Sequence, residues 1–422
     1  MTDQARRAAP PTAESPGAPE RPALKRTLSL PLVVLYGLGV TIGAGIYVLI
    51  GAAAGRAGLY APMAFVVSSV VMALTAASFA EMVSRLPVSA GEAAYVRAGF
   101  GSAKLSLLVG LLVVTSGIVS SAVITIGAAG YIRALADWPE LLLIPLLLLA
   151  MGAVAAWGIL QSVALAGLLT VIEAGGLVVV IAAAVADRPA VVTELAAVVP
   201  DLGDAAAWTA VVGTTLLAFF AFIGFEDMVN IAEEVVRPRR TMPWAIFLTL
   251  AIATVLYFAV TGVAVLAVPP AELAQSSAPL GLVFERVTGA SPVAITAIAI
   301  VATLNGVIVQ LIMAARVLYG LGCQGSLPAV LARVHPVTRT PLVATAVVVG
   351  IATALAMSFP LEGLAEMTSR VVLVVFALVN LALLRLKLRG DAAPDGAFAV
   401  WTWVPAAGFL SCLALLVGAA VG

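Results

Sequence analysis

Residues 36–55 read YGLGVTIGAGIYVLIGAAAG, an uncharged stretch long enough to cross the hydrocarbon core of a membrane as a helix. Residues 214–235 read TTLLAFFAFIGFEDMVNIAEEV, a stretch that is also uncharged in its first half but contains acidic residues in its second half. Glycine stands near the centre of both stretches, in Gly43-Ala44-Gly45 and in Ile223-Gly224-Phe225-Glu226. Because glycine costs a helix about 1 kcal/mol relative to alanine, we expect both helices to be interrupted at these points.

The composition of the chain indicates a membrane protein. Of 422 residues, 62% are hydrophobic and 10% are charged, whereas about a quarter of the residues in a soluble protein are charged. The formal net charge is +0 and the mean hydropathy is +1.14. These values exclude an ordinary cytosolic enzyme, a disordered chain and a nucleic-acid-binding protein, which needs a basic face.

Similar apolar runs recur along the chain between short polar connectors. The sequence therefore predicts an all-α, polytopic membrane protein with about eleven spans. The expected spans are residues 31–55, 60–84, 101–132, 140–157, 162–186, 207–235, 243–267, 292–320, 342–359, 364–384 and 401–421. Residues 1–28 are rich in Pro, Ala and charge, and we expect them to form a disordered cytoplasmic tail.

The distribution of positive charge predicts the orientation. With the N-terminus inside, sixteen of the 22 Lys and Arg residues fall in inner loops or the N-terminal tail, and four fall in outer loops. Inner loops of membrane proteins carry such an excess of Lys and Arg. We expect a multi-pass protein of the cytoplasmic (inner) membrane with a cytoplasmic N-terminus.

The two glycine-interrupted spans, the first and the sixth, predict an internal repeat. The second unit of such a repeat is inverted in the membrane, because it begins five spans after the first. We expect a first repeat at residues 29–190, a second at residues 205–390, and an extra span at residues 400–422. Paired interrupted helices in inverted halves are typical of a secondary transporter with its binding site at the midplane.

Interrupted helices expose backbone groups that suit a zwitterion. Amides after the Gly43–Gly45 break would receive a carboxylate, together with the helix dipole. Carbonyls near Thr41, Phe220 and Ile223 would receive an ammonium group. The alternative for the first span is close helix packing, because Gly39-x-x-x-Gly43 is a small-xxx-small pair.

Two carboxylates stand out, because Glu173 lies inside the fifth expected span and Glu226 lies just after the interruption of the sixth. An intramembrane carboxylate costs roughly 2.5–3.5 kcal/mol, so each is a candidate proton carrier. The structural alternatives are a neutral acid bonded to a backbone carbonyl for Glu173, and an ion pair or helix cap for Glu226.

Other residues near the sixth span have two interpretations. The aromatic side chains either pack together or form a lid over a substrate: Phe219, Phe220, Phe222 and Phe225. A charged group at the inner membrane edge fits a solvated cluster or a gate better than a ligand site: Glu233, Glu234, Arg237, Arg239 and Arg240. The chain has one histidine, His335, which we expect in a connector, and two cysteines, Cys323 and Cys412, which we expect to pack as apolar residues. This small set predicts no metal site, no cofactor and no enzyme active site.

Four motifs, in this order along the chain, resemble the amino acid–polyamine–organocation (APC) superfamily, in particular bacterial relatives of cationic amino acid transporters. They are GVTIGAGIYVLIG at 39–51, LPVSAGEAAYVRAGFG at 86–101, FFAFIGFED with AEEVVRPRRTMPWAI within 219–246, and ARVLYGLGCQGSLPAVLARVHPVTRTP at 315–341. The resemblance implies a five-plus-five inverted repeat with broken first and sixth helices, alternating access and amino acid transport.

The resemblance also implies roles for individual residues. The amides of Ala44 and Gly45 would meet the substrate carboxylate, the carbonyls of Thr41, Phe220 and Ile223 would meet its amine, and Phe220 or Phe222 would gate the site. The expected substrate-binding set is Thr41, Ile42, Gly43, Ala44, Gly45, Phe220, Ala221, Phe222 and Ile223.

The chain departs from the family pattern in two ways. The family usually has twelve helices, and this chain has about eleven expected spans. Proton-coupled members have a Lys on the fifth helix, where this sequence has Glu173. The eighth span offers only Thr303 and Asn305 near its middle as candidates for a sodium site.

We therefore expect a secondary active amino acid permease, driven by protons or working by exchange, whose partners are an amino acid substrate and the lipid bilayer. The alternative is a membrane sensor or non-transporting subunit that binds an amino acid. Binding without accumulation in vesicles would distinguish the alternative from the permease.

Overall fold

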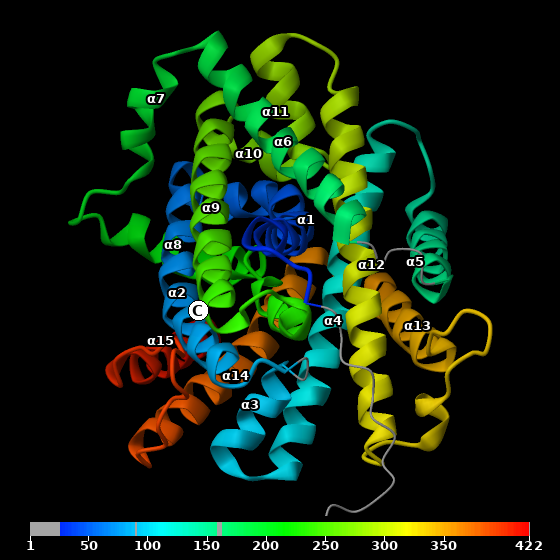
Figure 1. Cartoon of the computed structure of the whole chain (residues 1–422). Helices are drawn as coiled ribbons and strands as arrows, with labels where there is room; N and C mark the ends of the chain where they lie inside the picture. Colours follow the sequence, from blue (N-terminus) through cyan, green and yellow to red (C-terminus); the bar gives the residue numbers. More distant parts are fainter. Residues whose placement is uncertain (1–25, 89–90, 158–162, 422) are drawn as a thin grey trace, which may run out of the picture.

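The computed structural model describes residues 26–88, 91–157 and 163–421, most of which lie in helices packed into one bundle (Figure 1). The long helices of this described part are α1 (Leu30–Ala57), α2 (Ala61–Arg85), α4 (Ala103–Arg133), α5 (Glu140–Trp157), α6 (Val163–Asp187), α8 (Ala205–Phe220), α9 (Pro238–Ala267), α12 (Val293–Cys323), α13 (Leu342–Ser358), α14 (Leu361–Leu388) and α15 (Trp403–Val421).

Short helices connect the long ones. They are η1 (Gly58–Tyr60), α3 (Gly91–Phe100), α7 (Val191–Glu194), η2 (Leu195–Val198), η3 (Phe225–Glu234), α10 (Pro270–Gln275), α11 (Pro279–Thr288) and η4 (Ala329–Ala332). An isolated parallel bridge joins Leu28, before α1, to Val235, after η3.

Each span expected from the sequence coincides with one long helix, and the sixth comprises α8 together with η3. By length and composition, eight stretches of the described residues can cross a membrane, and three shorter apolar helices accompany them at residues 30–43, 342–358 and 403–418. The all-helical, polytopic fold is therefore confirmed. Of the expected tail at 1–28, residues 1–25 lie outside the described part.

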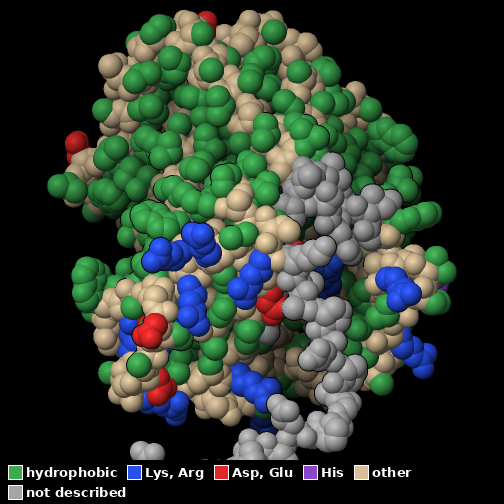
Figure 2. Space-filling model, in the orientation of Figure 1, with side chains coloured by type: hydrophobic (Ala, Val, Ile, Leu, Met, Phe, Trp, Pro, Cys, Tyr) green, Lys and Arg blue, Asp and Glu red, His purple; other side chains and the backbone are tan. Residues whose placement is uncertain are grey.

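The surface of the bundle fits a lipid environment. Large apolar side chains of α5 are exposed, among them Leu141, Leu142, Leu146 and Leu149. Figure 2 shows a mostly apolar upper part of one face, with Lys and Arg side chains gathered on its lower part. Exposed apolar side chains stay stable in hydrocarbon, where a soluble protein would have to cover them.

The expected interruption of the sixth span is present. Helix α8 ends at Phe220, residues 221–224 form a turn, and η3 begins at Phe225. Gly224 has φ +121°, a conformation that L side chains rarely adopt, and a Cβ there would lie 2.8 Å from Val40 Cγ1 of α1. Glycine is therefore required at this position by both conformation and space.

The expected interruption of the first span is wrong, because α1 continues as one α-helix from Leu30 to Ala57 through Gly43, Ala44 and Gly45. The glycines of α1 allow close packing instead. A Cβ on Gly43 would lie 2.9 Å from the carbonyl oxygen of Ala302 on α12, and one on Gly45 would overlap Ala221. The alternative of small residues at a helix interface therefore explains them.

A buried ion-pair network ties α2 to α14. Glu81 is fully buried, and its two carboxylate oxygens pair with Arg85 at 2.7 Å and with Lys387 at 2.8 Å. The backbone N–H of Val400 donates to the same carboxylate at 2.8 Å, which fixes the loop between α14 and α15. The single histidine, His335, lies in a connector as expected, whereas Cys412 is buried and Cys323 is exposed.

Candidate functional site

The turn that follows α8 packs directly on the middle of α1. Gly45 on α1 faces Ala221 in the turn, and Gly224 in the turn faces Val40 on α1. A glycine therefore lies at each of these two close contacts between the segments. The two segments proposed from the sequence to bind a ligand, residues 41–45 and 220–223, are thereby brought together. Thr41, Ile42, Phe220, Ala221, Phe222 and Ile223 are all buried at this contact.

The hydroxyl of Tyr257 on α9 joins these two segments. It lies 2.9 Å from the carbonyl oxygen of Thr41 and 2.9 Å from the carbonyl oxygen of Ala221. A hydroxyl has a single hydrogen to donate, which the two acceptors must share. The Thr41 carbonyl expected to receive an amine is thus already the acceptor of a protein donor, which a ligand ammonium group would have to replace.

Glu173 lies on α6 against α1 and α12. Its Oε1 accepts a hydrogen bond from Nδ2 of Asn305 at 2.9 Å, and a Cβ added to Gly43 would lie 3.3 Å from its Oε2. The carboxyl is fully buried, and its Oε2 has no hydrogen-bond partner among the described residues. Thr303, the other candidate on α12, donates its hydroxyl to the carbonyl of Ala299 within its own helix at 2.8 Å.

Glu226 caps the turn that interrupts the sixth span. Its Oε2 accepts from the backbone N–H of Gly224 at 2.8 Å, the structural role left open by the sequence. Its side chain also lines a small cavity with Asp227, Glu92 and Gln310, next to Ile223. Three buried carboxyl groups thus border one cavity beside the interruption.

Two hydrogen-bond acceptors of this cavity lack a donor. Within the described residues, Asp227 Oδ2 and Gln310 Oε1 are buried and have no hydrogen-bond partner. Glu92 lies on the short helix α3, outside the candidate spans, and burial raises the pKa of its carboxyl from 4.5 to about 8. A cavity of about 10 Å³ holds about one water molecule, and a water has the hydrogen atoms that these two acceptors lack.

The four phenylalanines around the interruption are completely buried in this conformation: Phe219, Phe220, Phe222 and Phe225. Phe222 packs on Tyr257 with ring centroids 5.0 Å apart, and Phe225 packs on Phe79 at 5.6 Å. Their packing role is therefore observed, and a lid role stays a prediction.

Sequence reasoning missed Tyr257, Asp227, Gln310 and Glu92. Asp227 and Glu92 had a usable signal, because both lie within the quoted motifs and both are acidic in a chain of which only 10% is charged. Tyr257 and Gln310 had none, since one aromatic or amide residue in an apolar helix does not reveal its partners. In the residues that the structure covers, groups of three or more His, Cys, Asp or Glu side chains placed to hold a metal ion are absent.

Comparison with known proteins agrees with the helical architecture. The family model described as amino acid permease matches residues 28–421. A branched-chain amino acid permease of Bacillus subtilis is 27% identical over 400 residues, covering 88% of this chain and 83% of that protein. An uncharacterized transporter of Mycobacterium tuberculosis is 32% identical over 399 residues, covering 93% and 86%. A methylthioribose transporter of Bacillus subtilis is 28% identical over 379 residues, covering 86% and 82%.

Proposed function

We propose, from the premise that this chain belongs to the amino acid permease family, that it carries amino acids across the cytoplasmic membrane by alternating access. Transport would be secondary active, either coupled to protons or working by exchange. Relatives named as a branched-chain amino acid permease and a methylthioribose transporter support a substrate that is an amino acid or a related small solute.

The observation that carries this proposal is the interrupted α8–η3 segment lying on α1. In a membrane, a turn within a span is tolerated only where its backbone groups are satisfied by protein, water or a ligand. We propose that Thr41, Ile42, Gly43, Ala44 and Gly45 of α1 face the substrate together with Phe220, Ala221, Phe222 and Ile223.

Substrate binding at this place requires movement, because Gly45 is in direct contact with Ala221. We propose that α1 separates from the turn and opens locally at Gly43–Gly45, where two glycines each lower the cost of leaving the helix by about 1 kcal/mol. Opening would free the amides of Ala44 and Gly45 for a carboxylate. The conformation described here is therefore assigned to a closed step of the transport cycle.

Proton coupling is proposed at Glu173 and Glu226. Glu173 faces Gly43 of α1 with a free carboxyl oxygen, so its protonation would change when α1 moves. Glu226 holds the turn through Gly224 and borders the cavity next to Ile223. Either carboxyl would therefore sense the same separation of α1 from the turn.

The membrane arrangement follows the positive-inside rule and is part of the proposal. All eleven long helices would cross the membrane, with the N-terminus cytoplasmic, repeats at 29–190 and 205–390, and an extra span at 400–422. Helix α8 with η3 would then correspond to α1 in the inverted second repeat.

The test uses purified protein in proteoliposomes. A thermal-shift screen of amino acids and thiosugars first identifies ligands, because a ligand that binds the native state raises the melting temperature. Uptake of each labelled hit is then measured with and without a pH gradient. Accumulation above the outside concentration supports transport, whereas binding without accumulation would favour the sensor or non-transporting subunit.

A further inference from the structure

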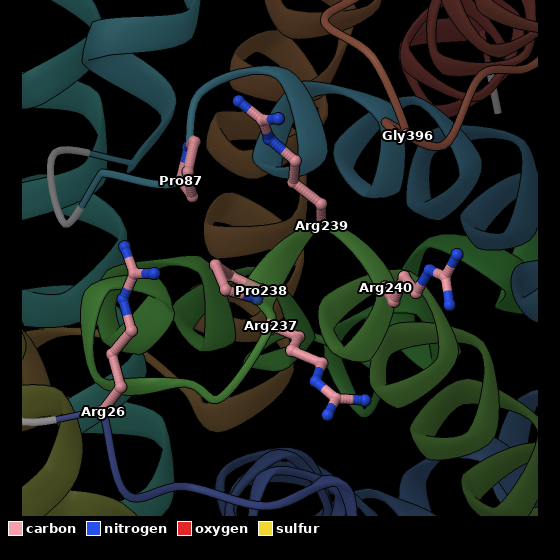
Figure 3. Close-up of a pocket in the computed structure, with 7 residues that line it drawn as sticks. All are labelled: Arg26, Pro87, Arg237, Pro238, Arg239, Arg240 and Gly396. Carbon is pink, nitrogen blue, oxygen red and sulfur yellow. The ribbon is translucent and has the colours of Figure 1, made fainter.

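Four arginine side chains line a single cavity of about 530 Å³ at the proposed inner end of the bundle (Figure 3). Arg237, Arg239 and Arg240 come from the junction of η3 and α9, and Arg26 comes from the segment before α1. The walls are completed by Pro87, after α2, Pro238, at the start of α9, and Gly396, between α14 and α15. The cavity is separate from the site around the turn after α8.

Among the described residues, no carboxylate forms an ion pair with the arginines of this cavity. Arg239 donates to the backbone carbonyl of Asp395 at 3.2 Å, an uncharged acceptor. In the described part of the chain, the guanidinium groups of Arg26, Arg237 and Arg240 have neither an ion pair nor a hydrogen bond. Several like charges around one cavity repel one another, and an anion held between them removes that repulsion.

The walls of the cavity are held in place by the backbone. The N–H groups of Thr27 and Leu28 donate to the carbonyl of Glu234 at 2.9 and 3.0 Å, and the N–H of Val236 donates to the carbonyl of Leu28 at 2.9 Å. Because Arg26 directly precedes Thr27 and Arg237 directly follows Val236, these hydrogen bonds bring the backbones of the two arginines together. The arginines line one cavity and are exposed, which agrees with the solvated cluster or gate expected from the sequence.

The surface next to the cavity is apolar and exposed. Along α9, Trp244, Leu248, Ile252 and Val255 follow Arg240 at intervals of four, four, four and three residues. This spacing places them on the same helix face as Arg240. All four are exposed, at 65%, 38%, 37% and 67%, respectively. Tryptophan near a cationic helix end is typical of the membrane–water interface.

We propose that this cavity binds the phosphate-bearing headgroup of an acidic phospholipid, with the acyl chains lying along the exposed face of α9. A free phosphate ion would use the arginines alone, whereas a lipid uses both the arginines and the apolar face beside them. Arginine pairs well with phosphate because its planar group donates two parallel hydrogen bonds. A lipid bound here holds the segment before α1 to the start of α9.

The test measures the melting temperature of the purified full-length chain in neutral detergent. The probes are a phosphatidylglycerol, a phosphatidylcholine with the same acyl chains, and inorganic phosphate at the same concentrations. We expect a saturable rise with phosphatidylglycerol that phosphatidylcholine and phosphate do not reproduce. Equal rises with both lipids would overturn headgroup recognition, and an equal rise with phosphate would overturn the lipid assignment.

Two double variants locate the site. The pair Arg26→Gln and Arg240→Gln removes two cavity charges without breaking a described ion pair, and we expect at least tenfold weaker binding of phosphatidylglycerol. The control pair Arg333→Gln and Arg389→Gln removes the same charge from exposed positions outside the cavity, and we expect unchanged binding. Unchanged binding in the first pair, or an equal loss in both pairs, would overturn this location.

Discussion

Gly45 on α1 lies so close to Ala221 in the turn after α8 that a single added methyl group would overlap the Cα atom of Ala221. The contact joins the middle of the first span to the interruption of the sixth. It also closes the space in which a substrate is proposed to bind.

Substitution Gly45→Ala should impair both stability and uptake. The new Cβ meets backbone atoms, which cannot turn away as a flexible side chain can, so α1 must shift from the turn. Overpacking of this kind costs roughly 1–3 kcal/mol. The control is Gly350→Ala on α13, where a Cβ would meet nothing within 4 Å. Equal melting temperatures and uptake rates for the two variants would contradict the proposed contact.

Substitution Tyr257→Phe should lower stability by about 1–3 kcal/mol and reduce transport. It removes the hydroxyl that donates to the carbonyls of Thr41 and Ala221, and the loss of a hydrogen bond in a fully buried contact is costly. Tyr95→Phe is the matched control, because Tyr95 is equally buried and its hydroxyl has no partner among the described residues. Thermal unfolding and initial uptake rates measure both variants. A larger loss of stability and uptake for Tyr95→Phe than for Tyr257→Phe would contradict the importance of the hydrogen bonds that Tyr257 donates.

Substitution Glu173→Gln should separate exchange from proton coupling. Glutamine keeps a carbonyl oxygen that can accept from Asn305, but it cannot release a proton. We expect exchange of inside for outside substrate to continue, while accumulation no longer follows a pH gradient. Asn305→Ala, which removes the hydrogen bond and keeps the carboxyl, should retain pH-driven accumulation. Persistence of that accumulation in Glu173→Gln would exclude Glu173 as the carrier.

Substitution Glu81→Gln should destabilise the fold by about 3–5 kcal/mol, because it leaves the paired charges of Arg85 and Lys387 partly buried without their carboxylate. Glu140→Gln breaks an ion pair with Arg133 of similar length, 2.6 Å, at an exposed position. Exposed pairs contribute about 0–1 kcal/mol. Denaturation of the two variants should therefore differ clearly, and equal losses would argue against the importance of the buried network.

The raised pKa of Glu92 predicts a pH-dependent stability. The folded protein holds the proton of this carboxyl up to about pH 8, whereas the ordinary value in an unfolded chain is 4.5. The folded state therefore binds more protons between these values, so the contribution of Glu92 to stability falls as pH rises from 4.5 to 8 and is constant above. Glu92→Gln should flatten that fall and raise the melting temperature at pH 8 relative to the parent. An unaltered pH profile would contradict the buried, protonated state.

The extent to which the fold follows from the sequence differs between the two glycine-containing spans. Long apolar runs predicted the eleven long helices of the described residues. At Gly224 the glycine lies beside the acidic pair Glu226 and Asp227, where a continuous helix does break. At Gly43 and Gly45 the same residue type serves close packing, because α6, α12 and the turn after α8 approach α1 there. Glycine content alone does not distinguish these cases, since the deciding contacts come from distant segments.

The candidate site could likewise be predicted from the sequence only in part. The sequence predicted that residues 41–45 and 220–223 bind one ligand, and in the structure these two segments pack against each other. It also indicated Glu173 and Glu226, because a carboxylate in an apolar span is costly and therefore conspicuous. The hydroxyl of Tyr257 and the arginine-lined cavity depend on which segments meet in three dimensions. The order of residues along the chain does not contain that information.

Counterflow in proteoliposomes tests whether the protein carries its ligand by alternating access. Vesicles loaded with an unlabelled ligand from the thermal-shift screen are diluted into a trace of the same ligand carrying a label, without any ion gradient. A carrier that alternates between two faces should give a transient overshoot of label inside the vesicles, and Gly45→Ala should reduce it. Label that rises only to the amount bound by the protein, without overshoot, would contradict transport by alternating access.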